Sequence, residues 1–406
     1  MLTFLGGIIT EEEYKWFSEN CIVGIPFSSN THQKSIIEAL RMYEDTDVIY
    51  ISPCGFYPTR FKKAFISQLY SDNRTKRIKS CNIPGLRVIY NIRTQIQALE
   101  ESINNGSNAI IVYMPYYARM KAVQVVKKRH PELTIIVYVP DLIVHSYSHK
   151  GIGIRRTIVK TLRKIESNKV EKLSKQVDGY VYLAEKMKEE FGFGKPYIIQ
   201  EAIYNIENSR NDLITESNSK HFSFTYCGKL DSTNGVDRLL NAFINIKNDK
   251  LKLNLCGDGP LLAKAQHLSQ TDNRIVVYGQ VSHDRVVQIE QESTVLVNPR
   301  YTAIENAAYS FPSKLIEYLA CGRPVISSHL SGIPREYDDH VFYIEDDSIE
   351  KLQEVMEQVI DIPREKLNEM GEDNYRFVLE NKSSYAQGKR MISFIKGLKL
   401  NGEHSS

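Results

Sequence analysis

Residues 309–326 read YSFPSKLIEYLACGRPVI, and this stretch predicts a loop, a helix, a tight turn and a buried strand in succession. Pro312 suits the first turn of a helix, where its missing N–H costs nothing, and Gly322 supplies the C-terminal stop. The apolar residues between them share one helix face, while Ser313 and Glu317, four residues apart, share the other. The free N–H groups of the first turn and the positive end of the helix dipole predict an anion site able to hold a diphosphate.

Short apolar runs rich in β-forming residues recur along the chain, with helical or polar segments between them. The first half contains DVIYIS (47–52), RVIYN (87–91), AIIVYM (109–114), TIIVYV (134–139) and DGYVYL (178–183). The second half contains FSFTYC (222–227), LKLNLC (251–256), RIVVY (274–278), TVLVNP (294–299), PVISS (324–328) and VFYI (341–344). Such alternation predicts parallel strands joined by crossover helices, and hence an α/β fold.

The length and one polar interruption predict two domains. A chain of 406 residues exceeds what one hydrophobic core usually supports. The stretch 204–222 is rich in Asn, Ser and charge, so we place a linker there. We therefore expect Rossmann-like doubly wound domains at 1–205 and 206–375, facing across a cleft, and a C-terminal helix at 376–398 that returns to the first domain.

Composition and charge limit the cellular locations and the binding partners that the sequence is compatible with. A net charge of +3 is too small to indicate nucleic-acid binding, and no apolar run approaches the length of about eighteen residues that spans a bilayer. The first residues lack a basic segment ahead of an apolar one, so we expect a cytoplasmic protein. The six cysteines form no C-x-x-C pair and suit reduced core thiols. We expect neither a metal ion nor another cofactor, because no metal-ligand motif occurs.

The block at 309–326 resembles the donor-binding signature of the GT-B retaining glycosyltransferases of family GT4, also called group 1. Two other blocks agree with that family in order and position: GKL at 228–230 followed by NGVDRLL at 234–240, and LCGDGP at 255–260. Gly279-Gln280-Val281 stands where the family has its base-binding loop. Three motifs in the family's order make chance agreement improbable. Capsular and exopolysaccharide transferases of Gram-positive bacteria are the nearest type.

This resemblance implies a GT-B fold and a hexosyltransferase. The donor would be a nucleotide diphosphate sugar, most simply a UDP-sugar, bound by the C-terminal domain. The acceptor would be a glycan or a lipid-linked glycan, bound by the N-terminal domain. The family also implies retention at the anomeric carbon without a metal ion, and a place in cell-surface polysaccharide synthesis.

In the second half, the resemblance assigns the donor contacts. Glu317 would accept hydrogen bonds from the ribose hydroxyls, Val281 would meet the base through its backbone, and Gly228 would lie beside the phosphates. The backbone amides that cradle the diphosphate would belong to Phe311, Pro312, Ser313 and Lys314. The ordinary interpretation of a lone Glu is a solvated carboxylate, and that of Gly228, Gly257 and Gly259 is a set of tight turns.

Three departures alter the family's phosphate clasp. Lys229 stands where the family has Arg, Asn234 where it has Lys, and Tyr309 where it has a first Glu. Lys229 can still act as a point charge, whereas Asn234, kept among the donor-binding residues, cannot neutralise a developing diphosphate. Arg300, which ends the strand run before the block, and Lys314 are the cations that could compensate. We assign Lys229 and Arg300 to catalysis.

The first half resembles the family less. Many members carry a His at the end of a strand near the reacting sugar, but here TIIVYV (134–139) leads into Asp141, with His145 four residues further on. Asp141 becomes the third catalytic candidate, although a turn or N-cap role is equally consistent with its position. Gly6 and Gly7 end the first apolar run, where the family's N-terminal loop approaches the sugar and the diphosphate.

Other polar segments admit two interpretations each. Asn30 and Gln33 would face the acceptor or a polar surface, and Glu305 would contact the donor sugar or solvent. A basic amphipathic helix predicted at 154–175 would make peripheral contact with the inner face of the membrane or stay solvated on the sheet.

Two other functions stay open. The missing His and the changes at Asn234 and Tyr309 are compatible with a noncatalytic subunit that assists an active transferase. A nucleotide-sugar epimerase shares the two-domain fold and would convert its donor with no acceptor present. NAD and P-loop chemistry are disfavoured, because no G-x-G-x-x-G follows a strand and no G-x-x-x-x-G-K-[ST] occurs.

Overall fold

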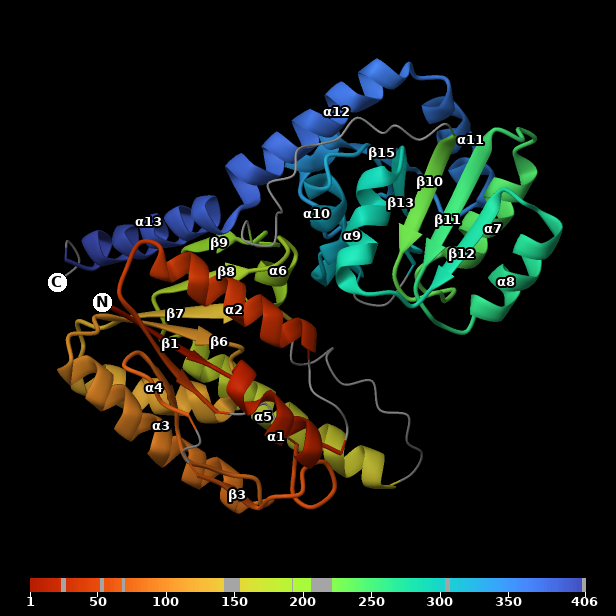
Figure 1. The fold of residues 1–406 in the computed structure, drawn as a ribbon. Helices are drawn as coiled ribbons and strands as arrows, with labels where there is room; N and C mark the ends of the chain where they lie inside the picture. Colours follow the sequence, from red (N-terminus) through yellow and green to blue (C-terminus); the bar gives the residue numbers. More distant parts are fainter. Residues whose placement is uncertain are drawn as a thin grey trace. The chain divides into compact units, whose positions relative to one another are not determined.

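The computed structural model describes residues 1–22, 27–51, 55–67, 70–141, 154–191, 193–205, 221–303 and 307–403. The chain divides into two compact units, each with its own sheet and helices (Figure 1). Unit 1 comprises Met1–Ile203 with Ser384–Ser406, and unit 2 comprises Tyr204–Ser383. Both main sheets are parallel, which confirms the predicted α/β class with two Rossmann-like units. Most of the expected linker at 204–222 lies outside the described residues.

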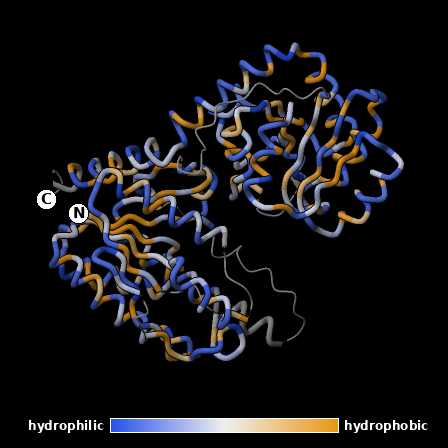
Figure 2. The backbone as a smooth tube through the Cα atoms, in the orientation of Figure 1, coloured by the Kyte–Doolittle hydropathy of each residue, from blue (hydrophilic) through white to orange (hydrophobic). Residues whose placement is uncertain are grey.

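Unit 1 is built on a seven-stranded parallel sheet in the order β4-β2-β1-β6-β7-β8-β9. Its strands are β1 Leu2–Gly6, β2 Thr46–Tyr50, β4 Thr75–Arg77, β6 Ala109–Tyr113, β7 Thr134–Val139, β8 Gly179–Tyr182 and β9 Tyr197–Ile199. A small antiparallel pair joins β3 Phe65–Ile66 to β5 Ser80–Cys81. Every residue of β1, β6, β7 and β8 is buried, as expected of parallel strands covered on both faces, and Figure 2 shows their hydrophobic colouring.

The helices of unit 1 connect these strands and cover the sheet. They are α1 Glu11–Asn20, α2 Phe27–Arg41, α3 Leu86–Asn104, α4 Tyr117–Arg129, α5 Ile154–Ser174, α6 Met187–Phe191 and α13 Ser384–Glu403. The last of them, α13, packs against α2 so closely that a Cβ on Gly388 would stand 2.2 Å from the carbonyl oxygen of Ala39. The return to unit 1 begins later than residue 376, because the π-helical segment Val378–Lys382 continues α12 within unit 2.

One predicted strand is wrong. The run RVIYN at 87–91 belongs to helix α3. The buried face of α3 carries the polar side chains of Asn91 and Gln95 beside Ala98 and Leu99. The apolar residues Ile89, Ile92, Ile96 and Leu99 do recur with the period of a helix, but the five residues 87–91 alone are too few to show it. The Asn91 side-chain oxygen accepts from the Cys81 amide over 2.9 Å, which compensates for burying the carboxamide. The helix is therefore held by hydrogen bonds that a hydropathy pattern does not register.

Unit 2 is built on a six-stranded parallel sheet in the order β12-β11-β10-β13-β14-β15. Its strands are β10 Phe222–Cys227, β11 Leu251–Cys256, β12 Ile275–Gly279, β13 Val295–Asn298, β14 Val325–Ser328 and β15 Val341–Ile344. Its α-helices are α7 Val236–Asn245, α8 Leu262–Thr271, α9 His283–Glu292, α10 Ser313–Ala320, α11 Ile349–Ile360 and α12 Arg364–Phe377. Within the described ranges of the whole chain, no helix is long and apolar enough to cross a bilayer.

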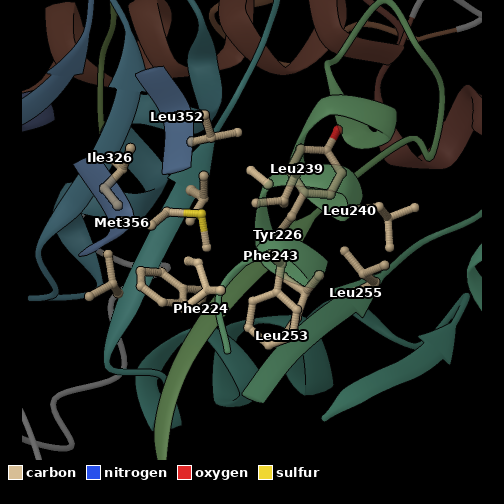
Figure 3. Close-up of a cluster of buried hydrophobic side chains, with 14 of the residues drawn as sticks. Phe224, Tyr226, Leu239, Leu240, Phe243, Leu253, Leu255, Ile326, Leu352 and Met356 are labelled. Atoms are coloured by element: carbon tan, nitrogen blue, oxygen red, sulfur yellow. The ribbon is translucent and has the colours of Figure 1, made fainter. Parts of the chain in front are cut away.

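The core of unit 2 lies between its sheet and two helices (Figure 3). Phe224 and Leu253 project from the central strands toward Leu239 and Phe243 of α7, while Met356 of α11 fills the neighbouring space. All five side chains are fully buried. The alternating runs FSFTYC and LKLNLC thus supply strand residues that bury one face against the helices.

Gly371 lies within helix α12 at a close contact with the end of α10. It interrupts the apolar pattern at the chain's C-terminal end, yet α12 continues through it from Arg364 to Phe377. A Cβ at Gly371 would stand 2.2 Å from the carbonyl oxygen of Gly322, at the end of α10. The glycine therefore permits close contact between α12 and the turn that leads into β14.

We expect Gly371→Ala to destabilise the protein by about 1 to 3 kcal/mol, because the added methyl group has no space against the backbone of Gly322. Gly397→Ala in α13 is the matched control, since no atom lies within 4 Å of a Cβ built there. Alanine at that open helical position should stabilise by about 0.5 to 1 kcal/mol. Urea denaturation of both variants measures the difference, and equal free energies of unfolding would contradict the packing argument.

Candidate functional site

The strand order of unit 2 places its candidate site between β10 and β13. The chain winds outward from β10 in one direction and from β13 in the other, so their connections diverge at this point of the sheet. Doubly wound sheets bind ligands at the carboxyl ends of the strands that flank such a reversal. The loops that follow β10 and β13 begin at Gly228 and Pro299 respectively.

Three neighbouring strands end at glycines with left-handed φ angles. Gly228, Gly257 and Gly279 follow or end β10, β11 and β12, with φ of 154°, 133° and 67°. The Gly228 amide donates to the Cys256 carbonyl over 2.7 Å, and the Gly257 amide donates to the Gly279 carbonyl over 2.8 Å. A Cβ on Gly257 would lie 1.8 Å from the Gly228 carbonyl oxygen. Gly257 is therefore required by backbone contact, and Gly228 by its left-handed φ angle, which supports the interpretation of both as tight turns.

Lys314 extends from the first turn of α10 to the end of β10. A Cβ on Gly228 would stand 2.5 Å from Cε and 2.8 Å from Nζ of Lys314, so the ammonium group lies directly against this glycine. The same Nζ is 6.0 Å from the centre of the Tyr226 ring. No carboxylate among the described residues forms an ion pair with it. A cation thus stands beside exposed helix N–H groups, as an anion site requires.

The helix that carries Lys314 begins one residue later than predicted. Pro312 is the N-cap residue of α10 and precedes its first turn, and Ser313 is the first helical residue. Phe311 points inward, with its ring centre 5.4 Å from that of Tyr337. Gly322 follows the helix with φ of 68°, which agrees with the predicted C-terminal stop.

Lys229 and Asn234 converge on a carboxylate that the sequence did not single out. Lys229 Nζ lies 3.0 Å from Asp231 Oδ2, and the backbone and side-chain nitrogens of Asn234 donate to Asp231 Oδ1 over 2.9 and 2.7 Å. Burial raises the pKa of Asp231, but the hydrogen bonds from Lys229 and Asn234 outweigh it and lower the pKa overall. Lys229 is two-thirds exposed at 68%, so its charge is both shared with Asp231 and open to solvent.

Arg300 follows β13 in a loop that a second arginine holds. Arg238 of α7 is buried and donates to the Pro299 carbonyl over 2.7 Å and to the Asp346 carbonyl over 3.0 Å. Arg300 Nε is itself buried and has no hydrogen-bond partner in the described part of the chain. The positive charge of Arg300 lowers the pKa of Tyr226, although burial raises that pKa overall. Arg300 and Lys314 therefore share Tyr226 as a neighbour.

Glu317 lies one turn after Lys314 on α10, and its side chain is exposed. Its negative charge acts on Glu290 of α9, a buried carboxyl group that the sequence did not indicate. Burial, and then the charge of Glu317, raise the pKa of Glu290 to about 7, while Lys314 opposes the rise. The Cys321 thiol donates to Glu290 Oε2 over 3.5 Å. Glu290 showed no sequence signal, because an isolated Glu in a helix is normally a surface residue.

The base-binding candidate Val281 is partly buried. It packs with Val286 against a small cluster of Cys227, Cys256 and Ile289 beneath the strand ends. The thiols of this cluster and Cys321 are free, in agreement with reduced core cysteines. Within the described ranges, no three His, Cys, Asp or Glu side chains are grouped so that they could hold a metal ion.

In unit 1, two predicted acceptor residues hold the loop after β1. The Gly7 amide donates to Gln33 Oε1 over 2.8 Å, and the Ile9 amide donates to Asn30 Oδ1 over 2.7 Å. Both carboxamides are buried. Gly6 ends β1, and a Cβ there would stand 2.7 Å from Gln33 Oε1. The suggestion that Asn30 and Gln33 face an acceptor is therefore replaced by a structural role, because their polar atoms bond to backbone.

A half-buried histidine at the strand reversal of unit 1 was not anticipated. The sheet of unit 1 reverses its order between β1 and β6, and His32 of α2 lies beside the end of β6. Its Nδ1 is 3.2 Å from the Tyr113 hydroxyl and its Nε2 is 3.1 Å from the Tyr138 hydroxyl. Burial lowers the pKa of His32 to about 4, so the ring is neutral at physiological pH.

The remaining candidates have separate locations. Asp141 is exposed just beyond β7, and its charge contributes to a raised pKa of Tyr113, which burial chiefly sets at about 12. Lys229 and Arg300 follow adjacent strands of unit 2, whereas Asp141 belongs to unit 1. His145 and Glu305 lie outside the described residues.

Comparison with known proteins agrees with this geometry. Residues 208–377 match the model of the family described as glycosyl transferases group 1. This segment is a glycosyltransferase domain. It includes the strand ends, the glycines, Lys314 and Glu317 described above, and the match and the fold together support a glycosyltransferase.

A curated relative is the gpi3 subunit of phosphatidylinositol N-acetylglucosaminyltransferase from Schizosaccharomyces pombe. It is 25% identical over 153 residues, which cover 35% of this chain. The match spans about a third of the relative's length, at 32%.

Solved structures resemble the whole chain. Sucrose-phosphate synthase from Thermosynechococcus elongatus is 15% identical with a TM-score of 0.59, covering 99% of this chain and 100% of that one. HepE of Anabaena, solved in complex with UDP, is 11% identical with a TM-score of 0.63, covering 98% of this chain and 100% of that one. At these identities the likeness shows the fold, which is GT-B.

We expect Glu290→Gln to change the pH dependence of stability. The folded-state pKa of about 7 lies above the ordinary 4.5, so the stability associated with Glu290 is complete below pH 4.5 and is lost as the pH rises through 7. The free energy of unfolding of Glu290→Gln should therefore be on the order of 2 to 3 kcal/mol higher than that of the wild type at pH 8. Near pH 4.5 the two free energies should be equal.

Denaturant titrations across this pH range measure the effect. Glu369→Gln on the exposed surface of α12 is the matched control and should leave the pH dependence unchanged. A difference between Glu290→Gln and the wild type that stays constant with pH would contradict the buried, protonated carboxyl group.

Proposed function

We propose that the chain is a retaining glycosyltransferase of family GT4 that transfers a hexose from a nucleotide diphosphate sugar to a glycan or glycolipid acceptor. The observation that carries this proposal is the position of Lys314, whose ammonium group lies against Gly228 at the N-terminus of α10. A helix N-terminus with a cation that has no ion pair within the described residues suits a diphosphate group.

The same arrangement provides a way to assist departure of the nucleotide. Glycosyl transfer passes through an oxocarbenium-like transition state, in which negative charge builds on the leaving diphosphate. Lys314, Arg300 and the amides at the start of α10 would stabilise that charge without a metal ion. Retention would follow if a donor phosphate oxygen accepts the proton of the acceptor hydroxyl on the same face of the sugar. This route needs no pair of catalytic carboxylates.

The remaining donor contacts belong to the same proposal. Glu317 is exposed one helical turn from Lys314, where its carboxylate can accept hydrogen bonds from ribose hydroxyls. Val281 would meet the base, and Gly6, Gly7 and Asp141 of unit 1 would act on the sugar or the acceptor. The complex of HepE with UDP supports UDP as the nucleotide, and the similarity to the gpi3 subunit of phosphatidylinositol N-acetylglucosaminyltransferase supports a lipid-linked acceptor.

The cellular setting is also proposed. The motifs resemble those of capsular and exopolysaccharide transferases of Gram-positive bacteria. This resemblance suggests that the transfer belongs to the synthesis of a cell-surface polysaccharide. A protein on the inner face of the membrane would meet a lipid-linked acceptor there. The basic segment 154–175, in which α5 forms a helix over Ile154–Ser174, is one candidate for that contact, and a second surface of unit 1 is considered below.

A noncatalytic subunit is the second candidate, because Asn234 replaces a phosphate-binding cation and bonds to Asp231 instead. Nucleotide-sugar turnover by the purified chain, measured in EDTA with and without a glycolipid acceptor, distinguishes the functions. Acceptor-dependent release of the nucleotide supports the metal-free transferase. Conversion of the donor without an acceptor would indicate the epimerase, and no turnover would indicate the noncatalytic subunit.

Replacement of Glu317 by Ala should weaken UDP binding by about 1 to 3 kcal/mol, because charge-assisted hydrogen bonds to the ribose would be lost. Isothermal titration calorimetry with free UDP measures the change. Glu369→Ala, an exposed carboxylate on α12, is the control and should bind UDP like the wild type. If Glu317→Ala binds UDP with unchanged affinity, Glu317 does not accept hydrogen bonds from the ribose.

Lys314→Ala and Arg300→Ala should each lower kcat by on the order of 100-fold to 1,000-fold and affect donor affinity less, because both cations would act on charge that develops during departure of the nucleotide. Steady-state kinetics measures kcat and the KM for the donor. Lys264→Ala, on the exposed side of α8, is the control and should behave like the wild type. Asn234→Lys in each background should restore part of the loss. Near wild-type kcat in both Ala variants would place the compensating charge elsewhere.

A further inference from the structure

One part of unit 1 exposes an unusual number of large apolar side chains. Among the described residues, fifteen large apolar side chains are exposed, and six of these lie between residues 56 and 89. They are Phe56, Tyr57, Phe65, Leu86, Val88 and Ile89, and we call them, together with Arg60, Lys62, Lys63, Arg87 and Arg93, the β3–α3 surface. Single exposed apolar residues are ordinary, whereas a contiguous group marks an interaction site.

Hydrogen bonds and ring contacts bring these residues together. The pairing of β3 with β5 places Phe65 opposite Cys81, and the Tyr57 amide donates to the Asn82 carbonyl over 3.1 Å. The Phe65 ring centre is 5.7 Å from that of Tyr90 in α3. The guanidinium carbon of Arg87 is 5.0 Å from the centre of the Phe56 ring. Figure 1 shows β3 beside α3 in unit 1. The loop, the short strand and the start of the helix therefore form one surface.

Helix α3 has an inverted polarity at its start. Leu86 and Ile89 are 44% and 56% exposed, while Asn91 and Gln95 are buried at 4% and 1%. A surface helix that only covers a soluble core shows the opposite distribution. The exposed apolar residues at the start of α3 contribute nothing to the core of unit 1, so they are available for another contact.

The charge of this region is strongly one-sided. Residues 55–94 contain nine Lys or Arg and one Asp. Three of the cations form ion pairs with carboxylates, namely Arg74, Lys76 and Arg77. Arg60, Lys62, Lys63 and Arg93 are exposed, and no ion pair joins any of them to a carboxylate of the described residues. Apolar side chains are thus accompanied by cations that have no acidic partner there.

We propose that the β3–α3 surface docks on an anionic lipid bilayer. The aromatic and aliphatic side chains would enter the interfacial region, where amphipathic rings are favoured, and the cations would meet lipid phosphates. A protein partner fits less well, because lysines are depleted from protein interfaces and a surface of one charge sign suits a continuous sheet of phosphates. The surface is distinct from α5, and its docking does not depend on transferase activity.

Sedimentation with lipid vesicles tests the proposal on the full chain. Vesicles of phosphatidylcholine with about 30% phosphatidylglycerol should bind the protein, and binding should fall as salt rises from about 0.1 to about 0.5 M. Leu86→Ser with Ile89→Ser, and separately Arg60→Glu with Lys63→Glu, should each reduce the bound fraction about tenfold. All four residues are exposed, so thermal unfolding of these variants should match the wild type.

Matched substitutions on α5 provide the control. Lys164→Glu with Lys172→Glu changes the same charge on exposed positions of α5, and Ile165→Ser removes an apolar side chain that is 47% exposed. These variants should bind vesicles like the wild type. The proposal is overturned if they lose binding while the β3–α3 variants keep it, if neutral and anionic vesicles bind equally, or if no vesicle binds.

The single tryptophan supplies a local readout. Trp16 of α1 is 5.8 Å, between ring centres, from Phe61, which lies between Arg60 and Lys62 in the chain. Brominated lipids in the anionic vesicles should quench Trp16 fluorescence when the surface docks, and the Leu86→Ser, Ile89→Ser double variant should abolish the quenching. Sedimentation of the wild type without quenching would place the bilayer against another face and overturn the proposal.

Discussion

The close contact between the ends of β10 and β11 is the constraint on which the candidate site of unit 2 depends. Their backbones approach so closely at Gly228 and Gly257 that a Cβ on the second glycine would overlap the carbonyl oxygen of the first. Only glycine adopts these left-handed angles without strain and leaves the strand ends uncovered. Lys314 of α10 then lies directly against Gly228, in space that any side chain at this glycine would occupy.

The cations around this contact differ in whether a carboxylate lies close to them. Lys229 is drawn to Asp231, which Asn234 also binds, so the replacement of a family lysine by Asn234 leaves the turn ordered but removes a charge. Lys314 and Arg300 both act on Tyr226, and no ion pair with a carboxylate of the described residues neutralises either of them. Burial raises the pKa of Glu290 to about 7, so below that pH the carboxyl group is mostly neutral and does not cancel the charge of Lys314.

Unit 1 shows how polar interactions can replace apolar packing inside a sheet-and-helix fold. Asn30 and Gln33 hold the loop after β1, and Asn91 holds β5 to α3, all through hydrogen bonds between carboxamides and backbone. These hydrogen bonds satisfy the buried polar atoms of the carboxamides. The apolar side chains that α3 does not need for its core are exposed instead, Ile89 among them, and they form the β3–α3 surface.

The sequence by itself determined the α/β class, most of the strands and the phosphate-binding helix, because these depend on local hydropathy, turn residues and a contiguous motif from 309 to 326. The strand predicted at 87–91 is wrong because five residues are too few to show the helical period of α3, which continues to Asn104. Tertiary structure alone brought Asp231 to Lys229, Glu290 within range of the Lys314 charge, and His32 between two tyrosines. Burial and pairing arise between segments distant in the chain, and no local pattern records which of them meet.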